Sequence, residues 1–381
     1  MTAPSPPRRA AMRLAVIVSE AGRDLARGVT RAGCCAAALG LALAGLVAVD
    51  GLAVRRLIAQ AQEFQDRGAA TLIITLAGGV DGRLCDALAR QPGVRAAGAV
   101  RVEADPLLFA QLPDSPVSFY SVSPGFAAML PAATGPDGAG LLVSREVAER
   151  FGFSLGSRID LAPSTAADNR SGWAAGTSRT AGWYDYPQDG RPPGFGYAAL
   201  APTPADQRFD QCWLDQYPVV PATSDLLYSV ILPDADTETS PPQINQHNGS
   251  LGAPTDPAAA YGQRPTAWAA AAAGLVGLAV GLLAVAARRV ELASNAHAGQ
   301  RRLDQLAAVG LETAAWALTA AAVGAAALAG VSRGLEPADR LAVARSLAGV
   351  VWAGVAGAMA GAWAAALVIR PSKLFAYAKE R

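Results

Sequence analysis

The sequence is short of charged, histidine, lysine and aromatic residues. Of its 381 residues, 17% are charged and 6% are aromatic, whereas 52% are hydrophobic. The mean hydropathy is +0.24. A soluble domain usually carries about 25% charged residues. The shortage of charge argues against an ordinary soluble enzyme, and the surplus of small apolar residues suits helices that pack closely in lipid.

The chain contains two lysines, Lys373 and Lys379, and neither follows the glycine pattern of a P-loop. A P-loop needs the lysine of Gly-x-x-x-x-Gly-Lys-Ser/Thr to hold nucleotide phosphates. The chain therefore cannot bind ATP in that way. Its net charge of +1 provides no basic field for a polyanion, so no nucleic-acid partner is expected.

Cysteine and histidine are also scarce, with four cysteines and two histidines. None of them has the spacing of a metal-ligand set, so we expect no metal and no bound cofactor. Cys85 and Cys212 both fall in the long segment after the first apolar run, and the sequence leaves open whether they form a disulfide. Cys34 and Cys35 are interpreted as small apolar residues.

No catalytic residue is expected either. Gly152-Phe-Ser-Leu-Gly156 matches the pattern of a nucleophile elbow, in which the serine lies on a turn from a strand into a helix. Here the predicted order is reversed, with a helix before the motif and a strand after it. The motif therefore favours a simple turn.

Four apolar runs are found, at 32–54, 267–287, 312–332 and 346–369. The last three are long enough to cross a membrane outright, and the first crosses it if Asp50 lies near the interface. A helix needs about 20 residues to cross a hydrocarbon core of about 30 Å. We therefore predict an α-helical membrane protein with four transmembrane helices. A mixed α/β extracytoplasmic domain at 55–266 is inserted between the first and second helices.

Basic residues set the predicted orientation. Eleven of them lie near the ends of spans on the side of residues 1–31, 288–311 and 370–381, against six on the other side. Lysine and arginine are enriched in cytoplasmic loops. We therefore expect a multi-pass protein of the plasma membrane with both termini cytoplasmic and an outer loop at 333–345. Residues 14–30 have the pattern of an amphipathic helix, which either lies on the inner membrane surface or extends the first span.

The outer domain is predicted from short strands that alternate with helices. A polar stretch rich in Gly, Pro and aromatic residues then interrupts this pattern and is interpreted as a long loop at 163–208. A second long loop is predicted at 234–264. The predicted strands are 71–76, 94–102, 116–122, 141–143, 158–161, 209–217 and 226–232.

Small and acidic residues mark particular points of the spans. Gly277 and Gly281, and likewise Gly357 and Gly361, are spaced for close helix packing within or between protomers. The acidic residues Asp50 and Glu312 are placed near the ends of their spans, where an ionised group costs little. No acid is expected at the midplane, which argues against a proton-coupled transporter.

The loop between the second and third spans carries the most informative pattern. Arg288-Arg-Val-Glu-Leu-Ala293 continues from the second span, and 300–312 has the spacing of a short amphipathic helix with a basic start. Such a helix is either a plain re-entry into the membrane or a docking surface for a cytoplasmic partner.

The order of these features resembles the FtsX/MacB-like ABC permease family. The resemblance is carried by the arrangement of one span, a large outer domain and three spans, and by Arg-Arg-x-Glu-Leu-Ala followed by Arg-Arg-Leu-x-x-Leu-x-x-x-Gly. It is also carried by the 140–161 segment and by Arg-Pro-Ser-Lys-Leu at 370–374. It implies a non-catalytic permease subunit that pairs with a second permease protomer, in a homo- or heterodimer, and with an ABC-type ATPase subunit that binds ATP.

In that family, ATP-driven motion of the partner is transmitted to the outer domain, for export or for handling a substrate or partner outside the membrane. The resemblance implies an ATPase-docking set within 288–311, formed by Arg288, Arg289, Glu291, Arg301, Arg302, Leu303, Leu306 and Gly310. The alternative is a membrane-anchored extracytoplasmic receptor or hydrolase without an ATPase partner. The aromatic residues of 173–197 would suit a receptor.

Overall fold

A computed structural model describes residues 14–27, 31–130, 140–162 and 176–379. The chain divides into two compact units. The helical unit comprises Met1–Ile58 and Tyr261–Arg381, and the sheet unit comprises Ala59–Ala260.

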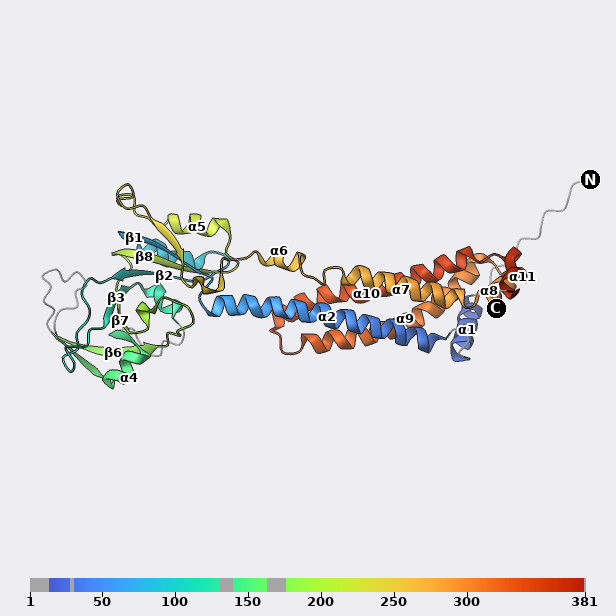
Figure 1. The fold of residues 1–381 in the computed structure, drawn as a ribbon, viewed down its shortest axis with the longest axis horizontal. Helices are drawn as coiled ribbons and strands as arrows, with labels where there is room; N and C mark the ends of the chain where they lie inside the picture. Colours follow the sequence, from blue (N-terminus) through green and yellow to red (C-terminus); the bar gives the residue numbers. More distant parts are fainter. Residues whose placement is uncertain (1–13, 28–30, 131–139, 163–175, 380–381) are drawn as a thin grey trace, which may run out of the picture. The chain divides into compact units, whose positions relative to one another are not determined.

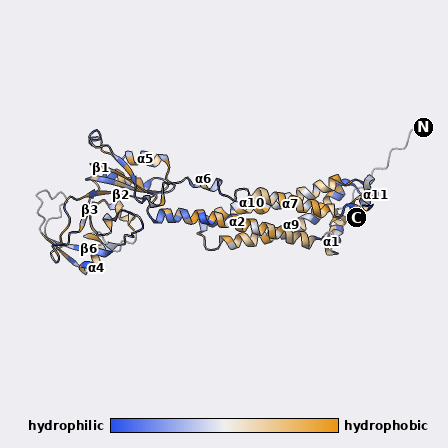
Figure 2. Cartoon of the chain, in the orientation of Figure 1, coloured by the Kyte–Doolittle hydropathy of each residue, from blue (hydrophilic) through white to orange (hydrophobic). Residues whose placement is uncertain are grey.

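Four helices of the described chain are long and apolar enough to cross a membrane. They are α2 (Ala32–Asp66), α7 (Ala269–Ala286), α9 (Arg302–Ser332) and α10 (Pro337–Val368). Within the helical unit they run alongside one another (Figure 1). Hydrophobic residues dominate α7, α9 and α10 (Figure 2). The predicted multi-pass helical architecture is confirmed.

Shorter helices accompany the long ones. They are α1 (Leu14–Ala26), α6 (Pro257–Gly262), α8 (Arg289–His297), the 3-10 turn η5 (Pro371–Lys373) and α11 (Leu374–Lys379). Helix α1 is separate from α2 and packs against α9, with Ile17 and Ala21 buried. It is therefore not an extension of the first span.

Helices α7 and α10 approach each other closely because both present glycine at the crossing. A Cβ added at Gly277 would overlap the carbonyl group of Gly354, and a Cβ at Gly357 would overlap that of Gly274. The same relation repeats one turn further along both helices. The predicted packing glycines therefore act within one chain, where they let two backbones touch. They are Gly277, Gly281, Gly357 and Gly361.

The sheet unit contains one mixed sheet, with nine strands in the described residues and the order β5-β6-β4-β7-β3-β2-β8-β1-β9. The β3–β7 and β4–β6 pairs are parallel and the other pairs are antiparallel. The strands are β1 (Thr71–Asp81), β2 (Val94–Val102), β3 (Ser118–Val122), β4 (Leu141–Ser144), β5 (Arg158–Leu161), β6 (Gly176–Tyr184), β7 (Ala198–Pro202), β8 (Arg208–Gln216) and β9 (Gln243–Gln246).

Short helices connect these strands. They are α3 (Gly82–Ala87), α4 (Arg145–Phe151), α5 (Pro221–Tyr228), and the 3-10 turns η1 (Leu88–Arg90), η2 (Pro124–Met129), η3 (Pro193–Phe195) and η4 (Gly249–Leu251). A disulfide joins Cys85 of α3 to Cys212 of β8 inside a core that includes Ile74 and Leu214. It links residues 127 positions apart, so it ties the first part of the unit to its last long strand.

The predicted long loop at 163–208 is wrong where the structure describes it, because β6 and β7 belong to it; residues 163–175 lie outside the described part. Strand β7 is an inner strand, between β4 and β3, and Ala198–Ala201 are fully buried. Three alanines and one leucine in succession have no periodicity of their own, so their strand state comes from their neighbours. The loop predicted at 234–264 likewise contains β9 and α6.

The strand predicted at 226–232 is also wrong, because helix α5 covers its first residues. Pro221 occupies the first turn of α5, where its fixed φ angle favours a helix and its missing N–H is not needed. Thr223 Oγ1 accepts a hydrogen bond from Val220 N–H at 3.0 Å, and Leu227 is buried in the core. The first residues of this apolar run therefore form the buried face of a helix, not a strand.

Two boundaries in the helical unit differ from the prediction. The separate amphipathic helix expected at 300–312 is the start of α9, which continues without a break to Ser332. The outer loop expected at 333–345 is short, because Pro337 starts α10 with Glu336 as its N-cap residue. A proline at the first helical position is a start signal that charge placement alone does not reveal.

Replacing Gly357 with Ala should destabilise the helical unit by about 1 to 3 kcal/mol, because the new methyl group forces α7 and α10 apart. Gly349 lies in the same helix with nothing within 4 Å of an added Cβ. Gly349→Ala should therefore stabilise the chain by up to about 1 kcal/mol through helix propensity. Equilibrium unfolding in mixed micelles compares the two, and equal effects would contradict the packing described here.

Candidate functional site

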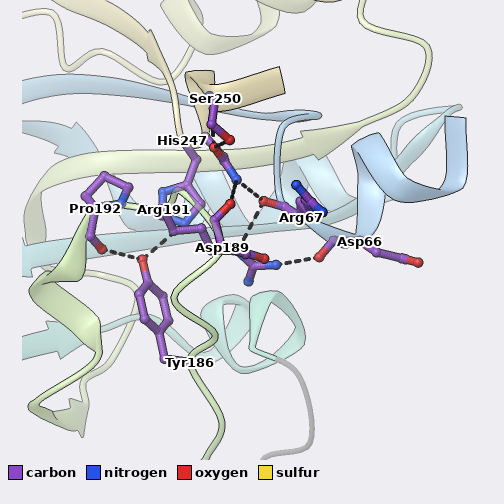
Figure 3. Close-up of polar contacts among 9 residues, drawn as sticks. Asp66, Arg67, Tyr186, Asp189, Arg191, Pro192, His247 and Ser250 are labelled. Atoms are coloured by element: carbon purple, nitrogen blue, oxygen red, sulfur yellow. Dashed lines mark hydrogen bonds and ion pairs between the residues drawn. The ribbon is translucent and has the colours of Figure 1, made fainter. Parts of the chain in front are cut away.

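The C-terminal end of α2 is held by two side chains of the sheet unit. Arg191 donates from Nε to the carbonyl oxygen of Arg67 at 3.1 Å and from Nη2 to that of Asp66. Asn248 donates from Nδ2 to the same Arg67 oxygen at 2.9 Å (Figure 3). The last carbonyl groups of a helix have no partner within it, and a cation is favoured at this negative end of the helix dipole. Arg191 and Asn248 therefore form a clamp on the end of α2.

The clamp is itself fixed on both sides. Asn248 is fully buried, and its Oδ1 accepts hydrogen bonds from the backbone N–H of Ser250 at 3.0 Å and from its hydroxyl at 2.6 Å. Its Nδ2 also donates to the carbonyl oxygen of Asp189 at 3.2 Å. Asp189 Oδ1 lies 3.2 Å from Arg191 Nε, and the Arg191 side chain is 9% exposed.

His247 lies beside the clamp and close to Tyr186 (Figure 3). Its ring centre also lies 4.4 Å from that of Trp213. Tyr186 Oη donates its one hydrogen to the carbonyl oxygen of Pro192 at 2.8 Å and lies 3.3 Å from His247 Nε2. The hydrogen-bond network therefore assigns the ring proton to Nε2, which donates to the tyrosine oxygen. Burial, and next the charge of Arg191, lower the pKa of His247 to about 4, so the imidazole is neutral at pH 7.

Asp50 lies in a buried ion pair of the helical unit. Arg264 donates from Nε to Asp50 Oδ1 at 2.8 Å and from Nη2 to Oδ2 at 3.2 Å, while the Thr266 hydroxyl donates to Oδ1 at 2.5 Å. The Asp50 side chain is 1% exposed. The sequence placed this acid at an interface where its charge would be hydrated, whereas the structure compensates the charge with a two-point arginine contact.

Arg288 is the centre of a second ion-pair cluster. Its guanidinium contacts Glu312, Glu291 at 2.6 Å and Asp24 of α1 at 3.3 Å. The side chains of Arg288 and Glu312 are 11% and 7% exposed. Arg288 thus joins α1, α8 and α9. It was predicted as a docking residue, but its charge is used inside the unit.

The predicted docking residues do not share one face. Leu303 is 78% exposed, Leu306 is half-buried, and Gly310 is buried, with Trp363 of α10 next to it. Trp363 Nε1 also donates to the carbonyl oxygen of Leu306 at 3.3 Å. Gly310 is therefore a helix contact within the chain, and the exposed part of the predicted surface is the start of α9.

Three of the predicted docking residues border a surface hollow. Arg288, Arg289 and Glu291 line a cavity of about 610 Å³ together with Tyr377 of α11. Arg289 lies 5.6 Å from the centre of the Tyr377 ring. Arg301 is half-buried and Arg302 is exposed at the start of α9.

The sequence did not identify Phe375, which is 90% exposed on α11. It also missed the role of Arg191, because two residues far apart in sequence from α2 form the clamp. A detectable signal was the alternation of β8, which sends Trp213 and Asp215 to one face and Cys212 and Leu214 to the other.

No catalytic arrangement accompanies the serine motif in the described residues. Gly152 ends α4 with φ 69°, and Gly156 has φ 74° before β5, so the segment is a turn from a helix into a strand. In the same part of the chain, no group of three or more His, Cys, Asp or Glu side chains is placed to hold a metal ion.

No family model and no curated protein matches the sequence. Among solved structures, the chain is similar to the periplasmic region of MacB from Actinobacillus actinomycetemcomitans, with a TM-score of 0.32 and 10% sequence identity. The match covers 47% of this chain and 90% of that chain. A likeness of this degree does not by itself assign a function.

Replacing Asp50 with Asn should lower the free energy of unfolding by about 3 to 5 kcal/mol, because Arg264 keeps a buried charge without its carboxylate. The double variant D50N/R264Q should lose less than the sum of the single variants. The matched control is Asp234→Asn, whose partner Arg208 is solvent-exposed, and stability should hardly change. Additive single effects in a double-mutant cycle would show that the pair is not coupled.

His247 should make stability depend on pH. Its pKa is about 4 in the folded chain against an ordinary value of 6.5, so the unfolded chain binds a proton that the folded chain rejects. The contribution is present above about pH 6.5 and is lost as the pH falls through about 4, by at most about 3 kcal/mol.

Unfolding free energies measured between about pH 7 and pH 4 test this expectation. His247→Phe should flatten the dependence, whereas His297→Phe, at the exposed end of α8, should retain it. An unchanged slope in His247→Phe would contradict the assignment.

Proposed function

We propose that the chain is the membrane-spanning permease subunit of an FtsX/MacB-like ABC transporter. The observation that carries this proposal is helix α2, which is 35 residues long, begins in the helical unit and ends in the clamp of the sheet unit. A continuous helix that packs in the core of the helical unit and is held by the clamp at its C-terminal end is suited to pass on a displacement along its length.

In this proposal the ATP-binding subunit docks on the part of 288–311 that remains open. Leu303 of α9 and Phe375 of α11 expose large apolar side chains near basic residues. Exposed apolar groups of this kind mark a surface for a partner or for lipid. The Arg288 cluster joins α8 to α1 and α9, so a force on α8 reaches two other helices.

The orientation follows from the basic residues: both termini and 288–311 are cytoplasmic, and the sheet unit lies outside. Two such permease protomers, alike or different, would work with two ATPase subunits. ATP-driven motion would then act on a substrate or partner outside the membrane, or drive export. The permease itself performs no catalysis in this proposal, since nucleotide is bound by the ATPase.

Leu303→Asp should abolish co-purification of the chain with an ABC-type ATPase subunit from the same host, because it places a carboxylate in an apolar contact. The matched control is Leu341→Asp, the same change at a 54% exposed leucine in the first turns of α10. That variant should retain the ATPase. Both variants should insert into membranes to the same level.

Two results would contradict the proposal. If a Leu303→Asp/Leu306→Asp variant still co-purifies with the ATPase, the start of α9 is not the docking surface. Failure of the wild-type chain to bind any ABC-type ATPase of its host would favour the alternative, a membrane-anchored receptor that works without ATP.

A further inference from the structure

The sheet unit contains, beside the clamp, a cavity of about 410 Å³ that is open on one side. This volume falls within the range of about 300 to 1,000 Å³ usual for small-molecule sites. Four aromatic side chains and two polar ones define its character: Phe126, Phe195, Trp213, Tyr186, Asp215 and His247.

The aromatic side chains form one connected wall. Trp213 makes edge contacts with Phe126 and Phe195, at ring-centre distances of 5.3 and 5.1 Å, and lies 4.4 Å from the His247 ring. The indole N–H of Trp213 already donates to Gln211 Oε1 at 2.9 Å. The wall therefore offers ring surfaces rather than free donors, and ring surfaces favour a planar apolar group.

Two buried acceptors of the cavity lining have no hydrogen-bond partner among the described residues. They are Asp215 Oδ1 and His247 Nδ1, on residues that are 9% and 6% exposed. His247 carries its proton on Nε2, so Nδ1 presents a lone pair. A buried polar atom without a partner costs about 1 to 3 kcal/mol, so an occupant that donates hydrogen bonds here is favoured.

The cations of the lining are already paired. Arg95 donates twice to the other oxygen of Asp215, Oδ2, at 3.0 and 2.7 Å, and also contacts Gln65. Arg191 is bound to the end of α2 and to Asp189. An anionic occupant would have to compete with these contacts, whereas a donor finds two buried acceptors that have no partner among the described residues.

We propose that this cavity binds a planar, largely apolar molecule that carries hydrogen-bond donors and no negative charge. An aromatic amine or an aromatic alcohol has this chemistry. The ring lies against Trp213 and Phe195, and the donors bond to Asp215 Oδ1 and His247 Nδ1. The site goes beyond the permease assignment and does not depend on it, because every residue involved belongs to the sheet unit.

Binding of fluorinated tryptamine to the full-length chain in detergent micelles, followed by fluorine NMR, tests the proposal. The amine should bind saturably. Fluorinated indole propionate has the same ring with a carboxylate and should bind at least about tenfold more weakly, since one charge-assisted hydrogen bond is worth a factor of this order. Equal affinity for the amine and the carboxylate, or no saturable binding of the amine, would overturn the proposal.

Two variants locate the site. Asp215→Asn should weaken amine binding about tenfold or more, and Trp213→Phe should weaken it while leaving the fold intact. Asp234→Asn is the control for loss of a carboxylate elsewhere in the unit. A retained thermal unfolding transition shows that each variant folds. Wild-type affinity in both folded cavity variants would show that the amine binds elsewhere and would overturn the assignment. The assay contains no ATPase, so its outcome is independent of the test of ATPase docking.

Discussion

The C-terminal carbonyl groups of α2 must find donors where the helix ends, and the start of the sheet unit depends on this constraint. The helix is 35 residues long and its last turn lies in the sheet unit. Arg191 and Asn248 supply the donors; Asn248 is buried, the Arg191 side chain is 9% exposed, and both are held by further contacts. A water-capped helix end could fray, whereas this end is attached to a folded unit.

Buried charges in the helical unit are compensated by ion pairs. Asp50 and Glu312 are each matched with an arginine from another helix or connecting segment, Arg264 and Arg288. Such pairs add little net stability compared with apolar residues, but breaking one is costly because the remaining charge stays buried. They therefore restrict which arrangements of the helices are accessible, while the glycines of α7 and α10 keep those two helices in direct backbone contact.

The periodic and compositional features could be predicted from the sequence, and the long-range ones could not. Four apolar runs were sufficient to predict the membrane helices, and β2 and β5 have the predicted bounds. Strand β7 was missed because Ala198–Ala201 carry no strand pattern and depend on β3 and β4. Gly310 was assigned to a docking face because helical spacing does not reveal Trp363, which lies 53 positions further along the chain and packs against it. The clamp and the cavity combine residues from five or more segments of the chain. No local sequence pattern predicts such a combination.

The cavity and the clamp share a boundary, since Gln65, Asp66 and Arg191 line the cavity. An occupant would touch the end of α2 and the residue that holds it. If α2 has two positions and the occupant binds one of them more tightly, then occupancy shifts α2 toward that position, and motion of α2 changes the affinity by the same factor. The end of α2 would thus respond to a small molecule bound in the sheet unit. The glycine contact and the buried ion pairs would limit that response to movements that leave the helical unit packed.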